Sequence, residues 1–84
     1  MTKELRQLRR IILNSALSGT EVRVFFHLLG HCETATDVSD SLGVPLVSVL
    51  KSLKKLRSLG LVEQIGSAGR AKILTAVLRD QSNN

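Results

Sequence analysis

The 84-residue chain has room for one domain with a modest core, because 43% of its residues are hydrophobic. It contains two Phe, no Tyr and no Trp, which argues against a single-strand nucleic-acid binder built on aromatic stacking platforms. The net charge of +5 favours a polyanionic partner.

The cysteine content and the absence of long apolar runs indicate the cellular setting. Cys32 is the only cysteine, so an internal disulfide and a cysteine-based zinc site are excluded. We interpret it as a small buried apolar residue, with a redox-sensing thiol as the alternative. No signal-peptide-like or membrane-spanning stretch occurs in the sequence. We therefore expect a cytoplasmic protein with no membrane partner.

The first predicted element is a basic amphipathic helix over residues 2–16. It makes up the N-terminal segment of the chain, residues 1–16. Leu5, Leu8 and Ile12 recur at three- and four-residue spacing. Such a stripe suits a homodimer interface and equally suits a helix that packs on its own domain. The pattern alone leaves both interpretations open.

The second predicted helix begins near Ser18 and runs to about Gly30. Ser18 can cap it while Glu21 reaches back, and Leu17 with Val22 can form the flanking apolar staple. Its dense apolar positions predict the central core helix.

The third predicted helix spans residues 35–42, and a tight turn follows it. Thr34 and Asp37 repeat the capping pattern at its start. Gly43 supplies the backbone freedom of a turn between two helices, and Val44 is expected in the core.

The fourth predicted helix spans residues 45–59, with Pro45 at its first helical position and Gly60 as a left-handed cap. Its apolar periodicity predicts a buried face. Residues 45–60 also carry four basic side chains and no acid, which favours nucleic-acid contact over a merely solvated face. The inward residues are Val49, Leu53 and Leu56, and the basic ones are Lys51, Lys54, Lys55 and Arg57.

Two strand candidates complete the chain, at residues 61–65 and 71–77, around a turn at residues 66–70. Together the segments predict a mainly α fold with a small β-hairpin. The main domain is expected at residues 17–78, and a flexible tail at residues 79–84.

This order of elements resembles the winged helix-turn-helix domain of transcriptional regulators, and the MarR-like group most closely. The resemblance covers about residues 17–77. The motifs that carry it are Leu17-Ser18-x-x-Glu21, Thr34-x-x-Asp37-Val38, Leu42-Gly43-Val44, Val49-x-x-x-Leu53-x-x-Leu56, Leu59-Gly60-Leu61-Val62 and a glycine-containing wing that ends in Arg70.

The resemblance implies a small transcriptional regulator whose partner is double-stranded DNA. In such domains the fourth helix enters the major groove and the wing reaches the backbone or minor groove. Basic residues there would neutralise phosphates, and Ser48 could bond a base edge or a phosphate. Carried over by position, the DNA-binding residues are Leu46, Val47, Ser48, Leu50, Lys51, Lys54 and Lys55 on the helix and Arg70 and Lys72 on the wing, with Arg57 as a further phosphate contact.

The leading end of the fourth helix departs from this pattern. Pro45 stands where relatives usually carry Ser or Thr, and Leu46, Val47 and Leu50 form an apolar cluster on the expected DNA face. An exposed apolar cluster is typical of a protein-docking surface, which is the alternative function. Alternatively, Leu46 and Leu50 fold back against the domain or a neighbour and belong to the core. A replication or partition accessory protein is a third interpretation.

Catalysis, cofactors and bound metal are not expected. His27 and His31 lie four residues apart, but two ligands are too few for a metal site, and neither Cys32 nor Glu33 adds a convincing third. A partly buried His27 beside Phe25 and Phe26 is the simpler interpretation. The glycines at 66 and 69 lack the Lys-Ser/Thr of a phosphate-binding loop.

Overall fold

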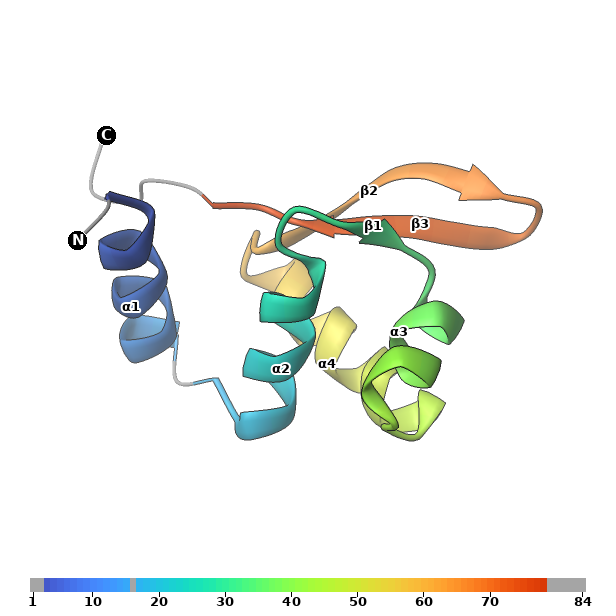
Figure 1. The fold of residues 1–84 in the computed structure, drawn as a ribbon, viewed down its shortest axis with the longest axis horizontal. Helices are drawn as coiled ribbons and strands as arrows, with labels where there is room; N and C mark the ends of the chain where they lie inside the picture. Colours follow the sequence, from blue (N-terminus) through green and yellow to red (C-terminus); the bar gives the residue numbers. More distant parts are fainter. Residues whose placement is uncertain (1–2, 16, 79–84) are drawn as a thin grey trace.

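The computed structural model describes residues 3–15 and 17–78, which form four helices and a three-stranded antiparallel sheet (Figure 1). The expected tail at residues 79–84 lies outside the described residues. The mainly α fold with its hairpin wing is confirmed. The elements are α1 (Lys3–Ser15), α2 (Gly19–Leu28), β1 (Cys32–Glu33), α3 (Ala35–Leu42), α4 (Leu46–Ser58), β2 (Val62–Ala68) and β3 (Ala71–Ala76).

Side-chain caps open α2 and α3 as the sequence predicts. The Ser18 hydroxyl accepts a hydrogen bond from the Glu21 amide, and the Ser18 amide donates to Glu21 Oε1 at 2.7 Å. Thr34 Oγ1 accepts from the Asp37 amide at 3.3 Å. Each cap satisfies amide groups that a helix N-terminus otherwise leaves unpaired, so local sequence sets where both helices begin.

The turn between α3 and α4 depends on Gly43. Its φ of 65° lies in the left-handed region, which side chains with a Cβ rarely adopt. The Val44 amide bonds the Ser39 carbonyl at 3.2 Å, and Ser39 Oγ donates to the Val44 carbonyl at 2.6 Å. Val44 is buried. These bonds fix the direction in which α4 leaves the turn.

The two ends of α4 differ in how they are capped. Pro45 is the N-cap residue with ψ of 140°, not the first helical residue that the sequence suggested, and no side chain caps the helix there. Gly60 has φ of 76°; its amide bonds the Arg57 carbonyl, and the Leu61 amide bonds the Leu56 carbonyl. This paired bonding is a Schellman termination, and it turns Leu61 into the core.

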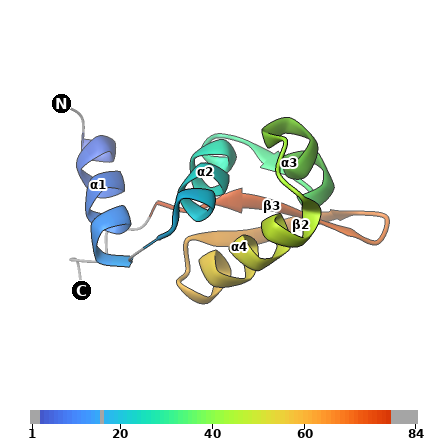
Figure 2. The same cartoon turned by 90° about the horizontal axis from the view of Figure 1, so that it is seen from below.

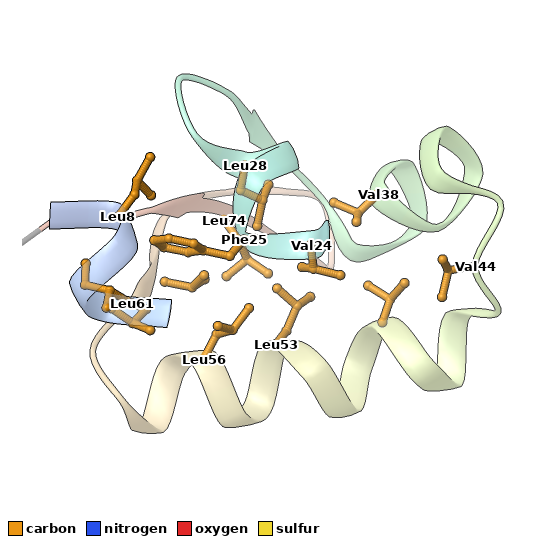
Figure 3. Close-up of a cluster of buried hydrophobic side chains, with 13 residues drawn as sticks. Leu8, Val24, Phe25, Leu28, Val38, Val44, Leu53, Leu56, Leu61 and Leu74 are labelled. Carbon is orange, nitrogen blue, oxygen red and sulfur yellow. The ribbon is translucent and has the colours of Figure 1, made fainter. Parts of the chain in front are cut away.

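The core lies between α2 and α4, with the sheet and α1 closing it. Figure 3 shows Leu53 and Leu56 rising from α4 toward Phe25 and Val24 of α2. From α1, Leu8 and Ile11 are buried in the same cluster. The buried apolar residues are Leu8, Ile11, Val24, Phe25, Leu28, Val38, Val44, Val49, Leu53, Leu56, Leu61, Val62 and Leu74.

The strand β1 was not predicted from sequence. It pairs antiparallel with β3, and the sheet order is β1-β3-β2. Two residues are too short for an alternating pattern to reveal a strand. The prediction that Cys32 is buried is wrong: Cys32 is exposed and Glu33 is partly buried, as expected of neighbouring strand residues that face opposite sides of the sheet.

The hairpin is longer than predicted and its turn is shorter. Residues 66–68 were assigned to the turn, but they pair with residues 71–73, so only Gly69 and Arg70 connect the strands. The register shifts between Gln64 and Gly66, which leaves Ile65 as an extra residue on β2. Gly69 provides the positive φ, 63°, that the short connection needs.

An ion pair joins the start of α2 to α4. Lys55 Nζ lies 3.3 Å from Glu21 Oε1, and the Glu21 side chain is only 15% exposed. The backbone amide of Ser18 lowers the pKa of the Glu21 carboxyl, and Lys55 adds to this effect against the opposing effect of burial. Glu21 therefore serves both as a cap and as an electrostatic link between helices.

Figures 1 and 2 agree that α1 lies at the end of the molecule opposite the hairpin tip. Among the described residues, no helix has the length and apolarity to cross a membrane.

Replacing Gly43 with Ala should lower the free energy of unfolding by about 1–2 kcal/mol, because a Cβ is strained at positive φ. Thermal unfolding would measure it as a fall in Tm of several degrees. Gly19→Ala is the matched control, since a Cβ at Gly19 meets nothing within 4 Å and its φ is not in the left-handed region. Equal stability of both variants would contradict this account of the turn.

Replacing Glu21 with Gln should keep the cap but remove the charge that pairs with Lys55. A carboxylate with a lowered pKa stabilises the fold above its ordinary pKa, and this contribution is lost as pH falls through the lower pKa of the folded state. Wild type should therefore lose more stability on acidification than the variant. At neutral pH the variant should be less stable by up to about 1 kcal/mol.

Chemical denaturation across the acid range measures both effects. Asp40→Asn removes one exposed negative charge from α3 and is the charge-matched control for the neutral-pH comparison. Identical acid dependence of wild type and Glu21→Gln would refute the role assigned to Glu21.

Candidate nucleic-acid interface

The outer face of α4 is set by the residues that the core buries. Each residue of an α-helix is rotated by about 100° from the last, and Val49, Leu53 and Leu56 are buried. The opposite side of the helix is then exposed, and it points away from the whole domain. The residues on that side are Val47, Lys51, Lys54 and Ser58.

The leading end of this outer face is apolar. Val47 is 64% exposed, Leu50 is 50% exposed and Leu46 is 41% exposed. These three residues, here termed the apolar leading end, do not fold back into the core. The alternative in which Leu46 and Leu50 belong to the core of their own domain is therefore wrong.

The trailing half of α4 is basic. Lys51, Lys54 and Arg57 are exposed. Lys55 is also exposed, but its ammonium group lies on the side of α4 that faces α2, where it pairs with Glu21. A phosphate would have to compete with that carboxylate for the ammonium group. Lys55 is therefore less available to a phosphate than Lys51, Lys54 and Arg57.

A groove with a volume of about 430 Å³ runs between α4, the start of α3 and the wing, from Arg70 at its tip along β3 to Leu74. Leucines from α4 and β3 form its floor, and basic side chains from α4 and the hairpin stand around it. The lining residues are Thr34, Ala35, Thr36, Leu46, Leu50, Leu53, Lys54, Arg57, Arg70, Ala71, Lys72 and Leu74.

The structure thus brings most of the residues singled out from sequence to one side of the molecule. Leu46, Lys54 and Arg57 share the groove with the wing residues Arg70 and Lys72. On the neighbouring outer face of α4 lie Val47 and Lys51. Ser48 is half-buried, so its hydroxyl is less accessible than the sequence pattern suggested.

Sequence reasoning missed Thr36 at the edge of the groove. Thr36 is exposed on the first turn of α3 and lines the groove opposite the wing. A hydroxyl on the first turn of the helix that precedes α4 was the available signal.

His27 is partly buried, as expected, and it also contacts Glu33, which the sequence did not predict. His27 Nε2 lies 2.6 Å from Glu33 Oε1, and the rings of His27 and His31 are 5.7 Å apart. The contact between His27 and Glu33 thus links α2 to β1. In the part of the chain that the structure describes, no group of three or more His, Cys, Asp or Glu could hold a metal ion.

The fold is shared with three solved structures. ZitR of Lactococcus lactis, solved as a mutant, superposes with a TM-score of 0.67 at 21% identity, over 73% of this chain and 43% of its own. AdcR, the adhesin competence repressor of Streptococcus pyogenes, gives 0.67 at 22% identity, over 89% and 60%. The ST1889 protein of the archaeon Sulfolobus tokodaii gives 0.72 at 22% identity, over 90% and 77%.

These identities show the fold alone, and the chain spans less than half the length of ZitR. Among curated proteins, no sequence matches the chain. The family of the sugar-specific transcriptional regulator TrmB, however, matches residues 15–79, which is well over half of the chain. The winged helix-turn-helix resemblance is confirmed. The chain belongs to the TrmB family of sugar-specific transcriptional regulators, and its winged helix is a DNA-binding domain of that class.

Proposed function

We propose that the chain binds double-stranded DNA with α4 in the major groove and the wing, residues 66–72, on the backbone or in the minor groove. The observation that carries this proposal is the convergence of cations from two elements that are distant in sequence. Lys54 and Arg57 of α4 stand around the same groove as Arg70 and Lys72 of the hairpin.

The shape of this surface suits duplex DNA. A helix of 13 residues is about 20 Å long, and the major groove of about 12 Å width admits an α-helix. With the outer face of α4 in the groove, the hairpin tip lies to one side of the helix (Figure 2). One DNA strand would then cross the basic rim between α4 and the wing, where phosphates meet Arg57, Arg70 and Lys72.

The contacts divide into strong and weak phosphate ligands. Lys51, Lys54 and Arg57 are the strongest candidates on α4, because their exposed side chains lie on the outer or wing-facing side. Lys55 contributes less, since binding a phosphate would cost it the bond to Glu21. Ser48 adds a hydroxyl at most to a neighbouring phosphate or base edge.

We further propose a homodimer whose seam is α1. Leu8 is buried in the core of its own chain, but Leu5 and Leu13 are exposed and Ile12 is half-buried. The apolar surface left for a partner is therefore shifted around the helix, to Leu5, Ile12 and Leu13. Dimerisation would double the DNA site. We also propose that the chain is MarR-like, on the basis of its capped helix starts. We propose a cytoplasmic location, because DNA is the proposed partner.

Docking of a protein partner is the second candidate. The groove floor of Leu46, Leu50, Leu53 and Leu74 is apolar and open, and such surfaces often mark partner sites. The basic rim would then select an acidic segment. DNA is favoured because the cations extend beyond the groove to Lys51, onto the outer face of α4 that a groove-bound peptide would leave uncovered.

Titrating a labelled duplex at several salt concentrations tests DNA binding. Affinity should fall steeply with salt, because each neutralised phosphate releases a counterion. Lys51→Ala should weaken binding and reduce the slope of log K against log salt by about 0.9. Lys55→Ala should reduce that slope by less, because its ammonium is paired with Glu21.

Arg9→Ala removes an exposed cation from α1, at the end of the molecule opposite the hairpin tip, and is the matched control (Figure 1). It should leave the slope unchanged. Absence of duplex binding at low salt, or binding that ignores salt, would reject the DNA proposal and favour the docking candidate.

Replacing Leu13 with Glu should leave the fold intact and convert the proposed dimer to a monomer, because a charge would enter the apolar seam. Sedimentation velocity over a range of protein concentrations would show the change. Arg9→Glu introduces the same side chain on the same helix and serves as the control. A wild-type protein that stays monomeric at every concentration would refute the seam.

A further inference from the structure

We infer that the apolar leading end of α4 reads C5-methyl groups in the major groove, so that the chain prefers thymine or 5-methylcytosine over bases without a methyl group. This inference rests on the proposed DNA binding and goes beyond it by naming the chemical feature that is recognised.

The first step is the chemistry of the exposed side chains. Recognition helices contact base edges mainly with residues near their N-termini. At those positions α4 exposes Leu46, Val47 and Leu50, and none of them can donate or accept a hydrogen bond. The major-groove edges of guanine, cytosine and adenine carry hydrogen-bonding groups and no methyl group, whereas thymine adds a C5-methyl group. Apolar contact is therefore the interaction that these three side chains can make with a base edge.

The second step is the direction of these side chains. Val47 lies on the side of α4 opposite the buried Val49 and Leu56, so it is the residue that would reach deepest into a groove. Leu50 lies about 60° around the helix from Val47, toward the wing. These two side chains therefore form one continuous apolar surface at the deepest part of the helix.

The third step is the spacing along the helix. Leu46 and Leu50 are separated by about 6 Å along the axis, at 1.5 Å per residue. Base pairs are stacked about 3.4 Å apart, so the separation between Leu46 and Leu50 is nearly the distance between a base pair and its second neighbour. The apolar leading end can therefore cover methyl groups on neighbouring base pairs, which predicts a preference for short runs of thymine.

The fourth step is the energetic role of the groove. Leu46 and Leu50 also line the groove, together with the buried Leu53 and Leu74. Polar base edges placed against these side chains would lose water without gaining a hydrogen bond, which is unfavourable. Methyl groups placed there would lose only apolar hydration. The same surface therefore binds a base that carries a methyl group more tightly than a base that lacks one.

Matched duplexes that differ only in methyl groups test the inference. The probes are a duplex of A·T pairs containing thymine runs, the same duplex with uracil for every thymine, a duplex of G·C pairs, and the same duplex with 5-methylcytosine. Fluorescence anisotropy at one low salt concentration gives the affinity of the full chain for each. Burial of a methyl group resembles burial of one methylene, so each contacted methyl should change affinity about fourfold.

Uracil should therefore weaken binding of the A·T duplex, and 5-methylcytosine should strengthen binding of the G·C duplex. The two arms change the methyl group in opposite directions and in different sequences. An effect of uracil on duplex flexibility alone would not reproduce the gain with 5-methylcytosine.

Variants assign the effect to the apolar leading end. Val47→Ser combined with Leu50→Ser should abolish discrimination between methylated and unmethylated duplexes while preserving the salt dependence. Lys51→Ala should do the reverse, keeping the discrimination and reducing the salt slope. If the double variant fails to unfold cooperatively, Val47→Thr keeps the side-chain shape, and its discrimination should be smaller than that of wild type.

The outcomes separate the inference from the proposal beneath it. Salt-dependent binding with equal affinity for the duplexes of each pair overturns methyl recognition and leaves DNA binding standing. Discrimination that persists undiminished in the Ser variants also overturns it. Failure to bind any of the duplexes at low salt overturns the DNA proposal itself.

Discussion

The packing of α4 against α2 is the interaction on which the rest of the structure depends. Val49, Leu53 and Leu56 fill one side of α4 and meet Phe25 and Val24 (Figure 3). Because an α-helix is rigid at this length, burying one side determines what the opposite side presents. Packing in the core thus also makes Val47 and Lys51 face outward. Any change that rotated α4 would change which residues the interface presents.

Two turns and one ion pair hold α4 in this orientation. Gly43 and Gly60 adopt positive φ at its two ends, where the chain enters and leaves the helix. Lys55 reaches Glu21 at the start of α2 and so resists rotation between the two helices. A basic residue within the DNA-binding helix is therefore partly structural, which a count of positive charges along the sequence would not distinguish from a phosphate ligand.

The local parts of the fold were predictable, and the long-range parts were not. Capping residues, apolar periodicity and glycine positions predicted the helices, because those signals act within a few residues. The pairing of β1 with β3, the bond from His27 to Glu33 and the exposure of Cys32 depend on partners that only the folded chain brings together. For the interface, sequence identified the basic residues but could not show that the wing completes a groove beside α4.

The exposed leucines of α4 carry an energetic argument of their own. The fold does not need Leu46, Val47 or Leu50 for its core, since the buried face of the helix is complete without them. Keeping apolar surface in water is unfavourable by roughly 25 cal/mol per Å², and polar residues at these positions would reduce that cost. Their position next to exposed cations places apolar contact and phosphate attraction on one surface. A duplex can satisfy both at once, because its major groove offers methyl groups on the floor and phosphates along the edges. This coincidence makes the apolar leading end a reading surface rather than a defect in the recognition helix.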